Sequence, residues 1–365
     1  MLYPTETTAL IAQPPFLTAD LAGIGGRIKV EPEDFEVEEI PAYAPSGSGD
    51  FLYLWIEKRG LGGEYFLRQV ARRLDVPVGE IGSAGIKDRH AVTRQWISVP
   101  LGAEERLAQL EGNGIRVLQV SRHTNKLRPG HLHGNRFRIV IRALEPQAPV
   151  DQIVAAWRER ILALGLPNFY GPQRFGTGGE TLQLGLALLL GNTDAQVKKK
   201  TRHPFVRKLA LSAAQSALFN VYLARRMLDG LYRKVLPGDV MAKVPFGGMF
   251  VAEDVMREQA RFDAGAIVSA GPIFGKKTFA AAGQAAAREQ AILAEFKLQP
   301  DVFVGFGKLV QGTRRHNIVY VQDLSAAMDG ATLRLSFTLP AGSYATMLVR
   351  ELMKTAISAD EDSSD

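Results

Sequence analysis

The sequence predicts an α+β protein whose sheet is largely antiparallel, and three observations support this. Several extended segments follow one another in the N-terminal part, and sequence-adjacent strands favour antiparallel pairing. The composition changes near residue 168, after which helical patterns dominate as far as residue 228. A last strand at residues 333–339 and a closing helix at residues 343–353 then end the pattern. A chain of 365 residues with this change of character suggests two domains.

The strands of the first part are predicted from alternation of polar and apolar residues. In residues 136–143, for example, Phe137, Ile139 and Ile141 alternate with arginines. The predicted strands are residues 27–40, with a bend at Pro32, and residues 50–58, 94–99, 115–120 and 136–143.

The helices are predicted from apolar stripes of helical period. One opens at residues 60–63 and carries its stripe to Leu74. The others are expected at residues 151–164, 212–228 and 280–296, with short strands and turns at residues 238–271. The acidic end, residues 358–365, has no apolar anchor and is predicted to be disordered.

Residues 81–100, IGSAGIKDRHAVTRQWISVP, contain the strongest functional signal. Asp88 lies in a predicted bend between two extended segments, between the cations Lys87 and Arg89. Nearby positive charge favours an ionised carboxylate. The three residues alone are more typical of a solvated surface turn than of a catalytic site, because surface ion pairs are common and weak.

The longer string AGIKDRHAVTRQW, residues 84–96, closely resembles the catalytic motif of the TruD family of pseudouridine synthases, which isomerise uridine at position 13 of transfer RNA. Other stretches resemble family sequences in family order. They are residues 32–39 (PEDFEVEE), 134–137 (GNRF), 168–176 (NFYGPQRFG), 211–220 (LSAAQSALFN) and 337–352 (FTLPAGSYATMLVREL).

The resemblance implies a pseudouridine-synthase catalytic domain with a mixed sheet flanked by helices, interrupted by an inserted α/β TRUD domain. We expect the catalytic domain at residues 1–167 and 317–357, the insertion at residues 168–316, and the acidic tail at residues 358–365.

The resemblance also implies that Asp88 is the nucleophile. Pseudouridine forms when the N1–C1′ bond breaks, the uracil turns, and C5 joins C1′. The reaction has no redox step, so no cofactor is expected. The sequence leaves open whether Asp88 attacks C1′, adds to C6, or removes the C2′ proton.

Three residues match family positions that contact the substrate nucleotide: Phe35, Asn135 and Tyr344. Aromatic faces stack on an extracted base, and an amide can hydrogen-bond its edge or the ribose. The competing interpretations are core packing for the aromatic residues and a turn position for Asn135.

Two further positions follow from the same resemblance. Phe137 occupies a position where many pseudouridine synthases have tyrosine, and a phenyl ring can stack but cannot accept the C5 proton. Lys29 precedes the PEDF motif and is expected to pair with Asp88 as its basic partner. The alternative for Lys29 is an exposed side chain on an edge strand.

A basic cluster formed by Lys198, Lys199, Lys200 and Arg202 is a candidate contact for the RNA backbone. A solvated helix end that complements the helix dipole explains it equally well.

Composition limits the remaining possibilities. The formal charge of +6 favours anionic partners, and the absence of cysteine fits a reducing, cytoplasmic setting. Without cysteine, the zinc site of nucleobase deaminases is excluded, and no metal site is expected. We read neither a signal peptide nor a membrane span.

The leading hypothesis is therefore a monomeric, cofactor-free tRNA pseudouridine synthase acting at position 13. A catalytically silent RNA-binding or RNA-folding protein on the same scaffold is the main alternative. A glycosidase-like hydrolase is a third, but it needs a second carboxylate as acid, and none is evident.

Overall fold

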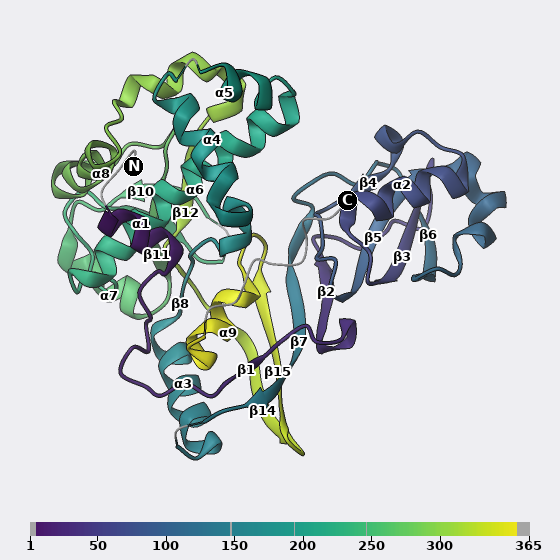
Figure 1. Ribbon diagram of the computed structural model, residues 1–365, viewed down its shortest axis with the longest axis horizontal. Helices are drawn as coiled ribbons and strands as arrows, with labels where there is room; N and C mark the ends of the chain where they lie inside the picture. The colour runs from purple at the N-terminus through teal and green to yellow at the C-terminus, as the bar shows by residue number, and fades with distance from the viewer. Residues whose placement is uncertain (1–4, 147, 193, 246, 356–365) are drawn as a thin grey trace.

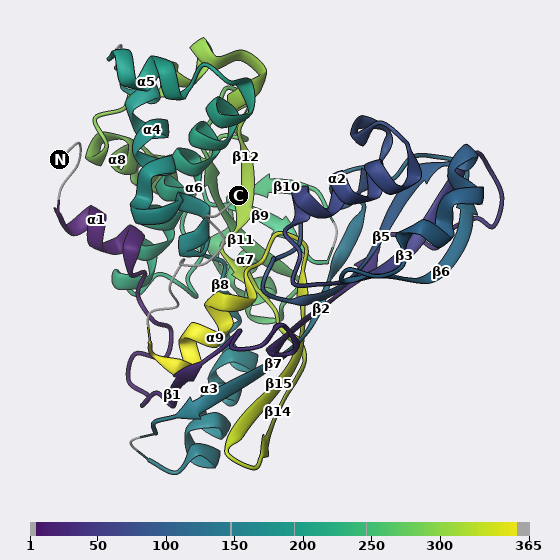
Figure 2. The same cartoon turned by 45° about the vertical axis from the view of Figure 1, so that its right-hand side comes forward.

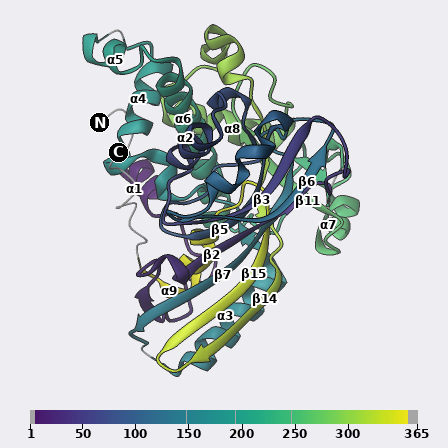
Figure 3. The same cartoon turned by 90° about the vertical axis from the view of Figure 1, so that its right-hand side faces the viewer.

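The computed structural model describes residues 5–146, 148–192, 194–245 and 247–355. Within these ranges the largest sheet has nine strands. They are β1 Gly25–Arg27, β2 Phe35–Pro41, β3 Phe51–Arg59, β4 Gly82–Ser83, β5 Val92–Pro100, β6 Ile115–His123, β7 Leu132–Leu144, β14 Gln322–Asp329 and β15 Thr332–Pro340. The order across the sheet is β14-β15-β7-β2-β5-β3-β6 (Figure 3). In addition, β1 pairs with β7 and β4 pairs with β5.

Strands β2 and β5 pair in parallel, and the other described neighbours in this sheet pair antiparallel. This confirms the predicted mixed, largely antiparallel sheet. The C-terminal strand β15 pairs with β7 along its whole length, from Leu333 opposite Ile141 to Pro340 opposite Gly134. The end of the chain therefore completes a sheet that its beginning started.

Helices cover this sheet at both ends (Figure 1). Helix α2, Gly63–Leu74, buries Phe66, Val70 and Leu74 in a core with strands β3, β5 and β6. Helices α3, Val150–Leu164, and α9, Ala345–Met353, contribute to a second core with β7 and β15. Apolar stripes with polar opposite faces explain why α2 and α3 each have one buried side, whereas α9 is buried along almost all of its length.

The alternation along β7 separates a core face from a charged face. Phe137, Ile139 and Ile141 are buried. The arginines of the other face pair with carboxylates of the neighbouring β2 region: Arg136 with Glu38, Arg138 with Glu36, and Arg142 with Asp34. Cross-strand ion pairs of this kind stabilise sheet register.

The elements between residues 172 and 316 form a second body that contains a four-stranded sheet of order β10-β9-β11-β12 (Figure 2). Its strands are β9 Val240–Lys243, β10 Met249–Val251, β11 Ile267–Ile273 and β12 Thr313–His316. Its helices are α4 Glu180–Leu189, α5 Ala195–Lys200, α6 Pro204–Leu228, α7 Val255–Asp263 and α8 Gly283–Glu295, with 3₁₀ segments η4 Pro172–Phe175, η5 Thr177–Gly179 and η6 Pro300–Val310.

Helix α7 corrects the expectation of only strands and turns at residues 238–271. Asp254 caps it by accepting a hydrogen bond from the backbone N–H of Arg257. A short helix rich in charged residues gives a weak apolar pattern, so the cap was its main sequence signal.

The chain enters and leaves this second body at one place. Strand β8, Leu166–Pro167, pairs antiparallel with β13, Ile318–Val319. Just beyond them, the Asn168 side-chain amide donates to the carbonyl of His316 over 2.9 Å. On these contacts we propose the division into a catalytic domain, residues 1–167 and 317–357, and an insertion at residues 168–316.

The N-terminal helix α1, Thr5–Ala12, departs from this division. Ile11 is buried in the core formed by α4 and α6, and Thr7 donates to Glu295 of α8. We therefore propose that α1 packs as part of the insertion although it begins the chain. The predicted disordered tail, residues 358–365, lies outside the described residues.

Candidate active site

A cavity of about 1290 Å³ opens between the large sheet and the insertion. On the sheet side it is lined by Phe35, Lys87, Asp88, Asn135 and Phe137. On the other side it is lined by Tyr170, Arg174, Arg315 and residues 341–346, which include Tyr344. Five of the six residues predicted at the catalytic site and for base contact thus line one cavity, and the sixth, Lys29, reaches Asp88.

Two lysines hold the segment that carries Asp88. The ammonium of Lys29 lies 3.1 Å from Oδ2 of Asp88, and both side chains are partly exposed. Lys58 is fully buried on β3, and its Nζ donates to the backbone carbonyl of Asp88 over 2.8 Å and to that of Leu61 over 2.6 Å. The carboxylate and the backbone of Asp88 are therefore both fixed by positive charge.

Lys29 adopts a backbone φ of 60°, in the left-handed region that a non-glycine residue rarely occupies. This conformation accompanies two contacts of its ammonium, one with Asp88 and one 4.6 Å from the centroid of the Phe35 ring. Strained backbone is kept where surrounding contacts over-determine it, and it is concentrated at functional sites.

Lys87 does not face Asp88, although the two residues are adjacent. Its ammonium lies 3.0 Å from a carboxylate oxygen of Glu39 and donates to Oδ1 of Asn135 over 2.7 Å. Both Lys87 and Glu39 are buried, and burial raises the pKa of Glu39 while the Lys87 charge opposes that shift. The basic partner of Asp88 is thus Lys29 and not its sequence neighbour Lys87.

Strand register explains how these side chains converge. Glu39 of β2 lies opposite Asn135 of β7, and Val37 lies opposite Phe137. Because side chains alternate along a strand, Phe35, Val37 and Glu39 share one face, and Asn135 and Phe137 share the corresponding face of β7. This face forms the floor of the cavity.

The two phenylalanines of the floor are well packed. Phe35 is 1% exposed and Phe137 is 6% exposed. Phe35 meets Phe137 edge to face at 6.2 Å between centroids, and Phe137 stacks on Phe337 at 5.3 Å. Both rings therefore belong to the core as well as to the cavity wall, and truncating Phe35 is expected to destabilise the fold.

Tyr344 forms part of the opposite wall. It is the residue before α9 and follows a turn in which Gly342 has a φ of 81°. Its ring meets Tyr170 edge to face at 5.8 Å. Burial raises the pKa of Tyr344, and the positive charges of Arg174 and Arg315 oppose the rise.

The basic cluster lies elsewhere. Lys198, Lys199 and Lys200 are exposed on α5, Arg202 is exposed in the turn that follows, and none of them lines the cavity. The next helix, α6, connects the two regions, because Leu209 near its beginning does line the cavity.

The cavity residues that sequence reasoning missed include Tyr170, Arg174 and Arg315. The first two lie in the stretch NFYGPQRFG, residues 168–176, which therefore carried a usable signal. Arg315 lies in no recognised motif, and its place depends on the pairing of β12 with β11.

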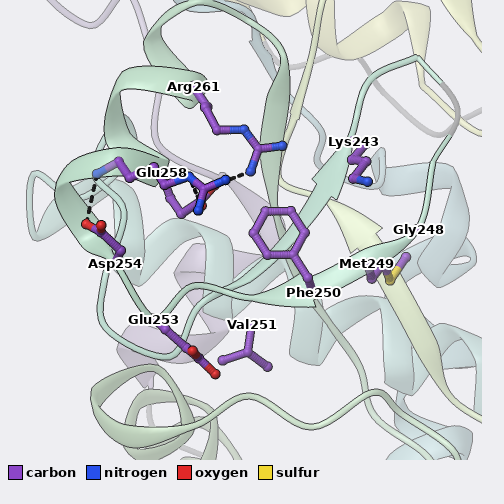
Figure 4. Close-up of a pocket in the computed structure, with 10 residues that line it drawn as sticks. Lys243, Gly248, Met249, Phe250, Val251, Glu253, Asp254, Glu258 and Arg261 are labelled. Atoms are coloured by element: carbon purple, nitrogen blue, oxygen red, sulfur yellow. Dashed lines mark hydrogen bonds and ion pairs between the residues drawn. The ribbon is translucent and has the colours of Figure 1, made fainter.

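A second cavity, of about 630 Å³, lies between the β9–β10 hairpin and α7 (Figure 4). Three of its charged residues, Arg257, Glu258 and Arg261, pair with one another. Glu258 pairs with Arg261 at 2.6 Å and with Arg257 at 3.7 Å. The larger cavity, with its catalytic-motif carboxylate, is the better candidate for the active site.

Among the described helices, none has the length and apolar character that a membrane span requires.

Comparison with known proteins gives a consistent picture. The family model described as tRNA pseudouridine synthase D (TruD) matches residues 14–208 and 200–352. A tRNA pseudouridine synthase D from Anaeromyxobacter sp. (strain Fw109-5) is 45% identical over 351 residues, covering 95% of this chain and 99% of the relative. One from Thermus thermophilus (strain ATCC 27634) is 44% identical over 341 residues, covering 93% and 92%.

The fold agrees as well. The crystal structure of a candidate tRNA pseudouridine synthase D from Methanosarcina mazei superposes with a TM-score of 0.74. It shares 25% sequence identity and covers 97% of this chain and 99% of its own. A family model that spans nearly the whole chain, close full-length relatives and this shared fold lead to one conclusion: the chain belongs to the TruD family of tRNA pseudouridine synthases.

Proposed function

We propose that this protein isomerises uridine to pseudouridine in tRNA, at position 13, with Asp88 as the nucleophile and without a cofactor. The observation that carries the proposal is the placement of Asp88. Its carboxylate lies in a large cavity, is paired with Lys29 at 3.1 Å, and faces a wall that contains Tyr344.

The chemistry suits a single activated carboxylate. The N1–C1′ bond breaks and a C5–C1′ bond forms, so the substrate and product have the same atoms and oxidation state. The protein must extract the nucleotide, hold the free uracil as it turns, and supply the carboxylate. Attack at C1′, addition at C6 and removal of the C2′ proton are all compatible with the position of Asp88.

Holding the base falls to the cavity walls. Phe35 and Phe137 supply aromatic surface on the floor, and Asn135 supplies an amide next to it. The side-chain oxygen of Asn135 accepts a hydrogen bond from Lys87. Its NH₂ group is therefore the end that we propose donates a hydrogen bond to the substrate. The C5 proton needs an acceptor other than Phe137, whose ring has no basic atom.

Tyr344 is proposed to act through its ring. Tyr344→Phe keeps the stacking surface and should retain near-normal turnover, whereas Tyr344→Ala should slow the reaction roughly tenfold to a hundredfold. Single-turnover rates of the two purified variants measure this, with melting temperatures as the control for folding. A large loss in Tyr344→Phe would instead assign the role to the hydroxyl.

The basic cluster of α5 is proposed to bind the RNA backbone. Changing Lys198, Lys199 and Lys200 to Ala should weaken tRNA binding and flatten the plot of log affinity against log salt by roughly one unit for each phosphate that the protein no longer neutralises. The rate on bound tRNA should change little. Lys234→Ala, beyond the opposite end of α6, is the control, and an unchanged slope in the triple variant would make the cluster a solvated helix end.

The division of the chain suggests that tRNA lies between the sheet and the insertion and contacts both. We expect the protein to be a monomer. We also expect it in the cytoplasm, because the lack of cysteine fits a reducing compartment.

The proposed function is tested by mapping pseudouridine in tRNA from cells with and without the gene. Loss of one modified site, restored by wild-type protein but not by Asp88→Asn, supports it. Unchanged modification would contradict it.

A further inference from the structure

Two arginines of the cavity wall share one aromatic ring. The guanidinium carbon of Arg315, on β12, lies 4.0 Å from the centroid of the Tyr170 ring, and that of Arg174, on η4, lies 5.6 Å from the same centroid. Both arginines line the cavity that contains Asp88.

The hydrogen-bond partners of these two arginines are neutral. Arg174 donates to the hydroxyl groups of Ser216 and Ser212 on α6. Arg315 donates to the backbone and side-chain oxygens of Asn168 and to the carbonyl of Gly342. Within the part of the chain that the structure describes, neither guanidinium forms an ion pair with a carboxylate.

Arg174 and Arg315 are half-buried. Two buried arginines of the same body, in contrast, have carboxylate partners. Arg226 is paired with Asp239, and Arg314 is paired with Glu289. A guanidinium withdrawn from water without a counterion is costly. Burial lowers the pKa of Arg315, Tyr170 and Tyr344 oppose that shift, and the charge of Arg174 adds to the lowering. The acids that line the cavity, Glu64 and Asp88, come from the opposite, α2 side.

Two positive charges that remain uncompensated inside a binding cavity are suited to an anion that arrives with the substrate. Uracil is neutral, so the base does not supply that charge. The phosphodiester backbone does, and the Nη1 group of each arginine, which none of these hydrogen bonds uses, is left to donate to phosphate oxygens. The protein's own neutral acceptors orient the two guanidinium groups without neutralising them.

We propose that Arg174 and Arg315 form the binding site for one phosphodiester group next to the extracted uridine. The insertion then holds the backbone at that phosphate, while the sheet side presents Asp88 to the nucleotide. This inference rests on the proposed RNA substrate and adds to it a specific anion site that is separate from the exposed lysines of α5.

Arg315 also ties Asn168 to Gly342, so its removal is expected to disturb the junction between the two bodies. The test therefore uses Arg174. Within the described residues, its guanidinium donates hydrogen bonds only to the hydroxyl groups of two serines. Arg174→Gln removes the charge and keeps a hydrogen-bonding group. Arg122→Gln is the matched control, because Arg122 is exposed, is paired with Glu104 and lies outside the cavity.

The experiment is a double-mutant cycle, in which the arginine substitution is combined with neutralisation of one phosphate of the RNA at a time. Unmodified tRNA is assembled with one neutral methylphosphonate at a time around the target uridine, and its affinity is measured for wild type and both variants. We expect one position at which neutralisation weakens wild-type binding about tenfold. Arg174→Gln should weaken binding of the all-phosphate RNA by a similar factor, and should have no further effect on RNA neutralised at that position.

Arg174→Gln should also flatten the salt dependence of log affinity by about one unit, and Arg122→Gln should leave both readings unchanged. The proposal would be overturned if, at every phosphate position, the affinity losses caused by Arg174→Gln and by the neutral phosphate simply multiplied. Equal affinity losses in the control variant would also overturn it. If Arg174→Gln does not fold, the wild-type scan still decides, because the proposal requires one sensitive phosphate.

Pseudouridine formation by wild type on the same RNA separates this inference from the proposed function. If pseudouridine forms but the arginine and phosphate changes act independently on affinity, only the anion site is disproved. If no pseudouridine forms but the two changes are coupled at one phosphate, the anion site is supported and the proposed reaction is disproved.

Discussion

Asp88→Asn is expected to lower pseudouridine formation by about four orders of magnitude or more, to the level of background. The amide keeps the shape of the side chain and its place beside Lys29, but it lacks the negative charge that a nucleophile or base requires. Folding and tRNA affinity should be retained, since Lys58 holds the backbone of this segment through the Asp88 carbonyl. Single-turnover assays with enzyme in excess over tRNA measure the effect.

Asp75→Asn is the matched control for this substitution. Asp75 is an exposed residue that ends α2 in a left-handed conformation, where asparagine is well tolerated, and it lies outside the cavity. It should keep wild-type turnover. Measurable turnover in Asp88→Asn above that of a no-enzyme reaction would remove Asp88 from the nucleophile role.

Lys87→Met is expected to destabilise the protein by about 3–5 kcal/mol at neutral pH, because it leaves Glu39 as a buried carboxylate without its partner. In the wild type the Lys87 ammonium lies 3.0 Å from Glu39, and both side chains are almost inaccessible to water. The substitution also removes the donor to Asn135, so turnover should fall as well. Urea unfolding of the purified variant measures the loss of stability.

The pH dependence of that loss has a defined sign. Burial raises the pKa of Glu39 already in the wild type, and Lys87 opposes the rise, so the variant should show a larger upward shift. A carboxyl group with a raised pKa in the folded state destabilises the fold as pH increases above its unfolded value. The variant's deficit should therefore be small below about pH 4 and grow towards neutral pH.

The double variant Lys87→Met/Glu39→Gln is the test of the cause. It removes the buried charge together with its partner and should recover much of the stability at neutral pH, since paired deletion of a buried ion pair is far less harmful than single deletion. If the double variant is as unstable as Lys87→Met and its deficit does not depend on pH, poorer packing rather than an unpaired Glu39 is responsible.

The sequence was most informative where local pattern determines structure. Alternation predicted the core face of β7, because Phe137, Ile139 and Ile141 face the interior whatever the topology around them. The resemblance in residues 84–96 and 168–176 drew attention to Asp88 and to the NFYGPQRFG stretch, and residues of both segments line the cavity. These predictions depended only on residues close together in the chain.

What the sequence did not predict depends on contacts between distant segments. Lys87 and Asp88 are neighbours in a loop, yet their side chains point to different partners, Glu39 and Lys29, which the packing of β2 and the residues after β1 supplies. Arg315 reaches the cavity only because β12 returns beside the start of the insertion. The arginines of β7 are paired with carboxylates of the β2 region, and these partners depend on the register between two strands that lie far apart in the sequence.

This chain alone is expected to convert a uridine of tRNA into pseudouridine. The most direct measurement incubates purified protein, with no cofactor added, and a full-length tRNA transcript carrying tritium at C5 of its uridines. Since C5 exchanges its hydrogen for a bond to C1′, each conversion releases one tritium into water. We expect release that approaches one tritium per tRNA molecule, with pseudouridine mapped to position 13. No release, or release spread over many uridines, would contradict it.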